Sequence, residues 1–208
     1  MNNILKDIKN IIFDFDGVII DSMDVRADGV SEVFAHYDKE LVDKFIDYYR
    51  YNAGLSKFLK IKYFYNEILN KDISEGKIEV YSNKLSEIMK EKLISKEVLI
   101  NDTCEFIKNN YKKFNFHIAS GSEENELRFL CNKLGIDKYF KSIKGAPLHK
   151  NDLVNNIIEE NSYKREETII IGDSINDFEA SESNDIGFVG YNNLQLQDKG
   201  LGYIYKFN

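Results

Sequence analysis

The sequence is poor in the residues that mark secreted, fibrous or membrane-spanning chains. Its 208 residues include one proline, Pro147, two cysteines, Cys104 and Cys131, and no tryptophan. Two cysteines so far apart argue against a disulfide framework and against a cysteine-rich zinc site. The sequence has no run of about 18 apolar residues that could span a bilayer, and its first ten residues are polar, unlike a signal peptide. We therefore expect a soluble protein of the cytoplasm.

Positive charge is also in short supply, because the formal net charge is −7 at pH 7. An acidic balance argues against nucleic acid or an anionic membrane as a partner, since phosphate-rich surfaces select basic proteins. What the chain does have is apolar material: 43% of its residues are hydrophobic and 13% are aromatic. That is enough for a core that needs no disulfide or structural metal. We expect a globular monomer or homodimer that acts on a small molecule.

The order of hydrophobic patterns along the chain predicts an α/β fold. Ile11-Ile12-Phe13 is a short continuous apolar run, typical of a strand buried on both faces of a parallel sheet. From about residue 22 to 99, apolar residues recur at three- and four-residue steps, which predicts four or five helices. After Leu99, strands are expected at 116–119, 142–144, 168–171, 186–189 and 203–205. Helices are expected between them, with Asp102 and Ser122 as N-caps of two of them.

Alternating strands and helices predict a doubly wound, mainly parallel, Rossmann-like sheet. The helical block is then an insertion into this α/β core. We predict a core domain of residues 1–20 and 97–208 and an all-helical cap domain of residues 21–96.

Polar residues follow several of the predicted strands, at the sheet edge where doubly wound proteins bind ligands. They are Asp14, Asp16, Ser120, Gly121, Ser122, Lys150, Asp173 and Asp177. Clustered carboxylates require a compensating cation, and an all-oxygen set suits a hard divalent ion such as Mg²⁺. Ser120 and the N–H groups that follow it, at an expected helix start, predict a phosphate pocket, with Lys150 as a second clamp. Such a site is equipped for phosphoryl transfer.

Four segments, in this order, resemble the motifs of the haloacid dehalogenase superfamily of hydrolases. They are Asp14-Phe15-Asp16-Gly17-Val18, Ser120-Gly121, Gly145-Ala146-Pro147-Leu148-His149-Lys150 and Gly172-Asp173-Ser174-Ile175-Asn176-Asp177. The helical insertion resembles the cap of the phosphoglycolate phosphatase and β-phosphoglucomutase branch. The resemblance covers essentially the whole chain, although Asn151 stands where many members carry proline.

The resemblance implies a role for each core residue. Asp14 corresponds to the nucleophile that forms an aspartyl-phosphate, and Asp16 to the general acid and base. Mg²⁺ would be held by Asp14, the main-chain carbonyl of Asp16 and Asp173. Asp177 would ligate through water or orient Lys150, and Ser120, Gly121 and Lys150 would bind the phosphoryl group. We therefore expect a Mg²⁺-dependent phosphatase acting on a small phosphorylated metabolite, such as a sugar phosphate.

The predicted cap is locally basic. Between Leu41 and Tyr65, lysine and arginine exceed aspartate by three. A positive loop at 52–57 that closes over the core would suit an anionic substrate and exclude water, whereas the alternative is a solvated helix face. Arg26, Arg50 and Lys57 are the candidate substrate contacts.

Other functions stay open on the sequence alone. A phosphomutase would share every core residue, but on a gap-free count Arg26 stands where the mutases of this branch carry a cap-linker histidine, which favours hydrolysis. A dehalogenase is disfavoured because such enzymes usually lack the second aspartate, here Asp16. A receiver-type signalling module or a member that only binds phospho-ligands is the non-enzymatic alternative. The sequence leaves the substrate and the oligomeric state open.

Overall fold

Strand β1 (Asn10–Phe13) lies in the middle of a six-stranded sheet in the computed structural model, which describes residues 4–52 and 54–207. The strand order is β3-β2-β1-β4-β5-β6, and every neighbouring pair is parallel. The other strands are β2 (Asn115–Glu123), β3 (Ser142–Ala146), β4 (Thr168–Gly172), β5 (Gly187–Tyr191) and β6 (Gly202–Ile204). The predicted doubly wound parallel sheet is confirmed.

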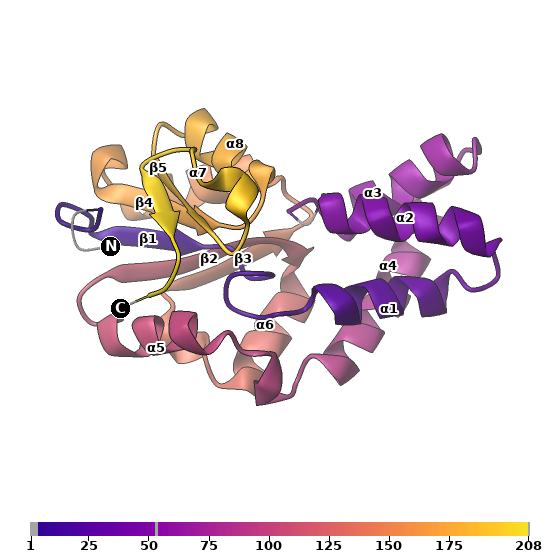
Figure 1. Ribbon diagram of the computed structural model, residues 1–208, viewed down its shortest axis with the longest axis horizontal. Coiled ribbons are helices and arrows are strands. Elements are labelled where there is room, and N and C mark those ends of the chain that lie inside the picture. Colours follow the sequence, from indigo (N-terminus) through magenta and orange to yellow (C-terminus); the bar gives the residue numbers. More distant parts are fainter. Residues whose placement is uncertain (1–3, 53, 208) are drawn as a thin grey trace.

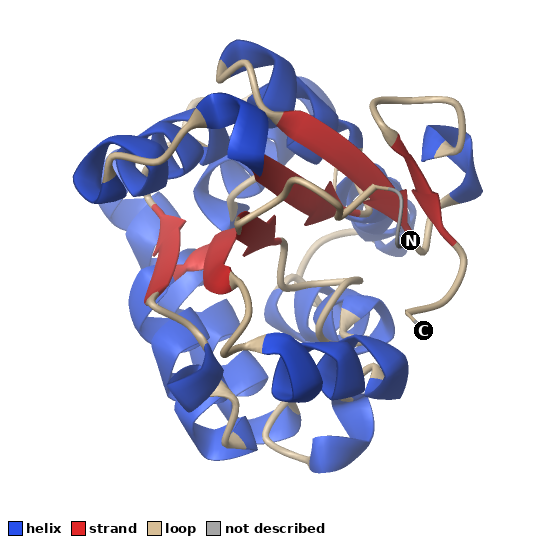
Figure 2. Ribbon diagram, turned by 90° about the vertical axis from the view of Figure 1, so that its left-hand side faces the viewer, coloured by secondary structure: helices blue, strands red, loops and turns tan. Residues whose placement is uncertain are grey.

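Helices cover both faces of the sheet (Figures 1 and 2). On one face lie α5 (Asn101–Asn110) and α6 (Glu124–Leu134), and on the other lie α7 (Lys150–Asn161) and α8 (Ile175–Ser183). Because side chains alternate along a strand, Ile11 and Phe13 of β1 pack towards α5 and α6, while Ile12 packs towards α7 and α8. Both faces of the central strand are therefore buried, as its continuous apolar run predicts.

The helical block lies at one end of the sheet, on the right of Figure 1. It consists of α1 (Met23–Val33), α2 (Lys39–Tyr51), α3 (Lys57–Tyr63) with a π-helical continuation at Phe64–Ile68, and α4 (Glu75–Lys92). These helices enclose a hydrophobic cluster of their own, in which Phe34, Phe45 and Phe64 are fully buried. The helical insertion is therefore present, and its division from the core at residues 21 and 96 stays a prediction.

Short 3₁₀ segments connect some of these elements, at Lys96–Val98, Asp137–Tyr139, Arg165–Glu167 and Leu194–Leu196. No helix among the residues described could cross a membrane, being either too short or too polar.

Two predicted helix caps are wrong. Strand β2 continues to Glu123, and the Glu123 carboxylate caps α6 by accepting hydrogen bonds from the N–H groups of Asn125 and Glu126, both at 2.9 Å. The hydroxyl of Ser122 instead donates a hydrogen bond to the carboxylate of Asp16. Asp102 lies inside the first turn of α5 and accepts a hydrogen bond from the Tyr191 hydroxyl at 2.8 Å. In both cases a tertiary partner outcompetes the local cap.

Candidate active site

Asp14 and Lys150 meet at the carboxyl edge of the sheet. Asp14 follows β1 and is buried, and its Oδ1 accepts a hydrogen bond from the N–H of Phe15 at 2.7 Å. Lys150 is the first residue of α7, and its Nζ lies 3.0 Å from Asp14 Oδ1 and 2.6 Å from Asp177 Oδ1. Three chain segments that are far apart in sequence thus converge, as the strand-end argument predicts.

Asp173 completes an acidic cluster with Asp14 and Asp177. One carboxylate oxygen from each of the three lies within 4.8 Å of the others. Asp173 Oδ1 is buried and has no hydrogen-bond partner within the described part of the chain. Gly17, with φ of +75°, lies so close that a Cβ there would be 1.9 Å from Asp173 Oδ2. An unpartnered buried oxygen in an all-oxygen donor set fits a hard divalent cation such as Mg²⁺.

Asp177 is held more tightly than Asp173. Its Oδ2 accepts hydrogen bonds from the N–H of Ser174 at 3.1 Å and from the Ser174 hydroxyl at 2.6 Å, in the capping box that begins α8. Its Oδ1 contacts Lys150. The carboxylate of Asp177 therefore caps the start of α8 and also holds Lys150. Orienting Lys150 is one of the two roles that the resemblance implies for Asp177.

The electrostatics of the cluster show a deficit of positive charge. Burial and the charge of Asp177 together raise the pKa of Asp14 to about 7, although Lys150 opposes the shift. Burial and the charge of Asp14 also raise the pKa of Asp173 well above its ordinary value. Burial lowers the pKa of Lys150, but Asp14 and Asp177 outweigh it, so the lysine stays charged. One lysine does not balance three carboxylates, and a bound divalent cation would complete the balance.

Asp16 faces the helical block instead. Its Oδ1 accepts hydrogen bonds from Arg26 Nε at 2.7 Å and from the Ser22 hydroxyl, and its Oδ2 accepts one from the Ser122 hydroxyl at 2.8 Å. Burial raises the pKa of Asp16, but Arg26 and these hydroxyls outweigh it and hold the pKa below its ordinary value. The Asp16 carboxylate is not part of the three-residue acidic cluster. Its predicted metal contact, which uses the main-chain carbonyl, stays a prediction.

The segment predicted to form the phosphate pocket has a different secondary structure from the one expected. Because β2 runs on to Glu123, the N–H groups of Gly121 and Ser122 do not begin a helix, and that part of the prediction is wrong. The N–H of Ser122 donates to the buried Ser120 hydroxyl at 3.1 Å. The backbone of Gly121 lies close to the helical block, since a Cβ there would lie 2.5 Å from the carbonyl oxygen of Gly54. Phosphate binding by Ser120, Gly121 and Lys150 stays a prediction.

The three basic residues predicted to contact the substrate lie in two different places. Arg26 and Lys57 are buried and line, with Asp16, a cavity of about 10 Å³, which has room for about one water molecule. Arg50 instead pairs with Asp24 at 2.8 Å on the surface and borders an open groove of about 570 Å³. Residue 53 of the predicted positive loop at 52–57 lies outside the described residues.

Three residues of this cavity region were not among the candidate site residues chosen from the sequence: Glu126, Lys60 and Tyr49. Glu126 of α6 has no exposed surface and contacts both Arg26 and Lys57. Lys60 Nζ lies 3.9 Å from the centre of the Tyr49 ring. A signal for Glu126 was present, because it precedes Leu130 and Leu134 by four and eight residues and so lies on the buried face of its helix.

Comparisons with known proteins agree on the fold. A family model described as haloacid dehalogenase-like hydrolase matches residues 11–191. The β-phosphoglucomutase of Clostridium difficile is similar with a TM-score of 0.79 and 19% identity, over 97% of this chain and 92% of that one.

Two further structures are similar at low identity. The CbbY protein of Rhodobacter sphaeroides, solved with xylulose-(1,5)bisphosphate, has a TM-score of 0.79 and 15% identity, over 96% and 95% of the two chains. A predicted phosphoglycolate phosphatase of Haemophilus somnus has a TM-score of 0.69 and 15% identity, over 97% and 90%. No curated protein matches the sequence.

Proposed function

The chain belongs to the haloacid dehalogenase-like hydrolase family, and from this premise we propose that it hydrolyses the phosphate monoester of a small metabolite. The observation that carries the proposal is the cluster of Asp14, Asp173 and Asp177 with Lys150, in which all but the half-buried Asp173 are buried. It combines a nucleophile, oxygen ligands for a cation and a fixed positive charge, which are the parts that phosphoryl transfer needs.

In the proposed mechanism Asp14 is the nucleophile. Its Oδ1 is held by the Phe15 N–H and by Lys150, so Oδ2 attacks phosphorus while the bond to the leaving oxygen breaks. The product of this step is an aspartyl-phosphate. Mg²⁺ held by Asp14 and Asp173 would neutralise charge on the phosphoryl oxygens when bound. Lys150 and Ser120 would bind the same oxygens as the phosphoryl group moves.

Asp16 serves as the acid and base of this mechanism. It would protonate the leaving oxygen in the first step and take a proton from the water that hydrolyses the aspartyl-phosphate in the second. The contacts of Asp16 with Arg26 and Ser122 favour the ionised carboxylate, which suits the second step. For the first step Asp16 has to bind a proton before it can give one to the leaving oxygen. Residues 21–96 would act as the cap that excludes bulk water around these groups.

The test is phosphate release from a panel of sugar and small-metabolite phosphates, with Mg²⁺ and with EDTA. We expect Mg²⁺-dependent release that Asp14→Asn abolishes. Asp43→Asn is the matched control, because Asp43 is an exposed carboxylate that pairs with Lys39 at the surface. Release that survives Asp14→Asn, or no release from any compound, contradicts the proposal. Phosphorylation of Asp14 without net release would favour a phosphomutase.

A further inference from the structure

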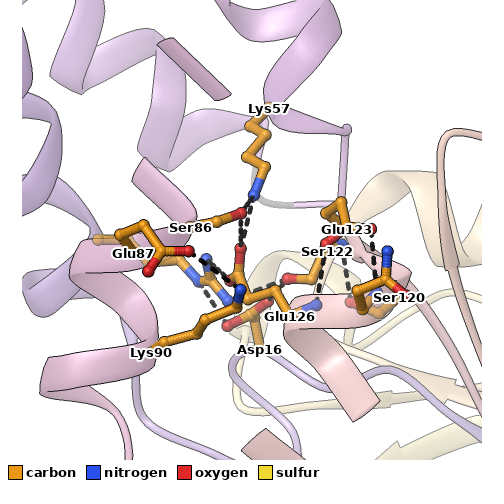
Figure 3. Close-up of polar contacts among 11 residues, drawn as sticks. Asp16, Lys57, Ser86, Glu87, Lys90, Ser120, Ser122, Glu123 and Glu126 are labelled. Atoms are coloured by element: carbon orange, nitrogen blue, oxygen red, sulfur yellow. Dashed lines mark hydrogen bonds and ion pairs between the residues drawn. The ribbon is translucent and has the colours of Figure 1, made fainter. Parts of the chain in front are cut away.

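Glu126 is a buried carboxylate that joins the core to the helical block. It lies on α6, and its Oε1 is 3.1 Å from Arg26 Nη1, while its Oε2 is 2.6 Å from Lys57 Nζ. The Ser86 hydroxyl of α4 donates to Oε2 at 2.9 Å. Figure 3 shows Lys57 pointing from the helical block towards Ser86 and Glu126. One carboxylate thus binds side chains from α1, α3 and α4.

These contacts are required by burial. The side chain of Glu126 has no exposed surface, and those of Arg26 and Lys57 are 6% and 3% exposed. A buried charge that loses its partner destabilises the fold strongly. Glu126 is therefore expected to stay bound to both cations.

The same two cations line the cavity beside Asp16. Arg26 contacts Asp16 and Glu126 at once, so two negative and two positive groups balance there. Lys60, a third cation of this lining, lies over the Tyr49 ring, and burial lowers its pKa to about 7. Asp16 and Glu126 therefore compensate the charges of Arg26 and Lys57 in this wall.

A carboxylate that bridges an arginine and a lysine occupies them as a carboxylate or phosphate of a ligand would. We propose that Glu126 determines specificity by taking the place of a second anionic group of the substrate. The preferred leaving group is then uncharged and carries hydroxyl groups, as in a polyol or sugar monophosphate. Esters that carry a carboxylate or a second phosphate on the leaving group are rejected. This inference rests on the phosphatase activity proposed above.

The experiment compares substrates whose leaving groups end either in an uncharged hydroxymethyl group or in a carboxylate. The pairs are 2-hydroxyethyl phosphate against phosphoglycolate, and glycerol 3-phosphate against 3-phosphoglycerate. The wild type should have a kcat/KM at least about tenfold higher for the uncharged member of each pair. Glu126→Gln frees the two cations, so the ratio should shift by about tenfold or more towards the anionic member.

Glu87→Gln is the matched control, because Glu87 follows Ser86 in sequence, is 72% exposed and pairs with Lys90. It should leave the ratio unchanged. A merely structural role for Glu126 would lower kcat/KM for both members alike and leave the ratio where it was, which would overturn the proposal. Equal use of both members by the wild type would also overturn it.

If Glu126→Gln does not fold, the same kcat/KM ratios are measured for Lys57→Met. It leaves Glu126 paired with Arg26 and adds net negative charge to the wall, so the preference for the uncharged member should grow severalfold. A weaker preference would overturn the proposal. If the wild type releases phosphate from other esters but shows no preference within either pair, the specificity proposal alone fails. If it releases none from any ester, the proposed function itself fails.

Discussion

Replacing Arg26 by methionine should destabilise the protein strongly. Arg26 pairs with Asp16 at 2.7 Å and with Glu126 at 3.1 Å, and all three side chains are at most 10% exposed. The substitution keeps most of the apolar stem but leaves two buried carboxylates short of a cation. Removing one partner of a buried ion pair costs about 3–5 kcal/mol. For a chain of this size that corresponds to a fall in Tm of roughly 6–20 °C.

Arg50→Met is the internal control for this measurement. Arg50 pairs with Asp24 at 2.8 Å, a similar distance, but the two side chains are 45% and 87% exposed. An exposed pair contributes about 0–1 kcal/mol to stability. Comparing the loss of stability in the two variants therefore separates the effect of burial from that of the contact distance. Thermal unfolding followed by far-UV circular dichroism is the suitable assay, because the chain has no tryptophan.

The reasoning is refuted if Arg26→Met loses no more stability than Arg50→Met. The pH dependence gives a second check. The pKa of Asp16 is held below its ordinary value by Arg26 and two hydroxyls. The ionised Asp16 therefore contributes to the free energy of unfolding above the unfolded-state pKa of about 4. This contribution is lost as the pH falls through the lower folded-state pKa. The deficit of Arg26→Met relative to wild type should shrink in acid.

Three further predictions concern single groups. Burial and neighbouring lysines lower the pKa of His117 to about 4. Between about pH 6.5 and 4 the unfolded chain then binds more protons than the folded one. The free energy of unfolding of the wild type relative to His117→Gln, measured with urea, should therefore fall by up to about 3 kcal/mol on acidification. A difference that does not change with pH contradicts this. Because burial raises the pKa of Asp14 to about 7, Mg²⁺ affinity measured by calorimetry should rise with pH through that value with proton release; affinity that is independent of pH contradicts it. Gly17→Ala would place a Cβ 1.9 Å from Asp173 Oδ2 at a φ of +75°. The variant should lose the rise in Tm that Mg²⁺ causes in the wild type, and an unchanged rise contradicts the assigned site.

The core of the site was predictable because local patterns determine it. Asp14 and Asp173 directly follow apolar strands that the sequence marks clearly, and Lys150 opens a helix on the same edge of the sheet. In a doubly wound sheet the strand ends share one edge, so these residues converge whatever the details of packing. The same reasoning placed the helical insertion, since helical periodicity is visible without tertiary information.

The contacts between the helical block and the core were not predictable in this way. Lys57 was interpreted as a substrate contact from local charge alone, whereas in the fold it pairs with Glu126, which lies 69 residues further along the chain. Ser122 was expected as a helix cap, but it donates its hydroxyl to Asp16. Both outcomes depend on which side chains the folded chain brings together across an interface, and no local pattern encodes that choice.

The most direct test of the account is acid-quenched mass spectrometry of the enzyme during turnover of a hydrolysed phosphate ester. We predict a phosphoryl group on Asp14, formed within the first turnover, absent in Asp14→Asn, and longer-lived in Asp16→Asn because the base for the second step is gone. Turnover without phosphorylated Asp14, or a phosphoryl group on another residue, would contradict the assignment of Asp14 as the nucleophile.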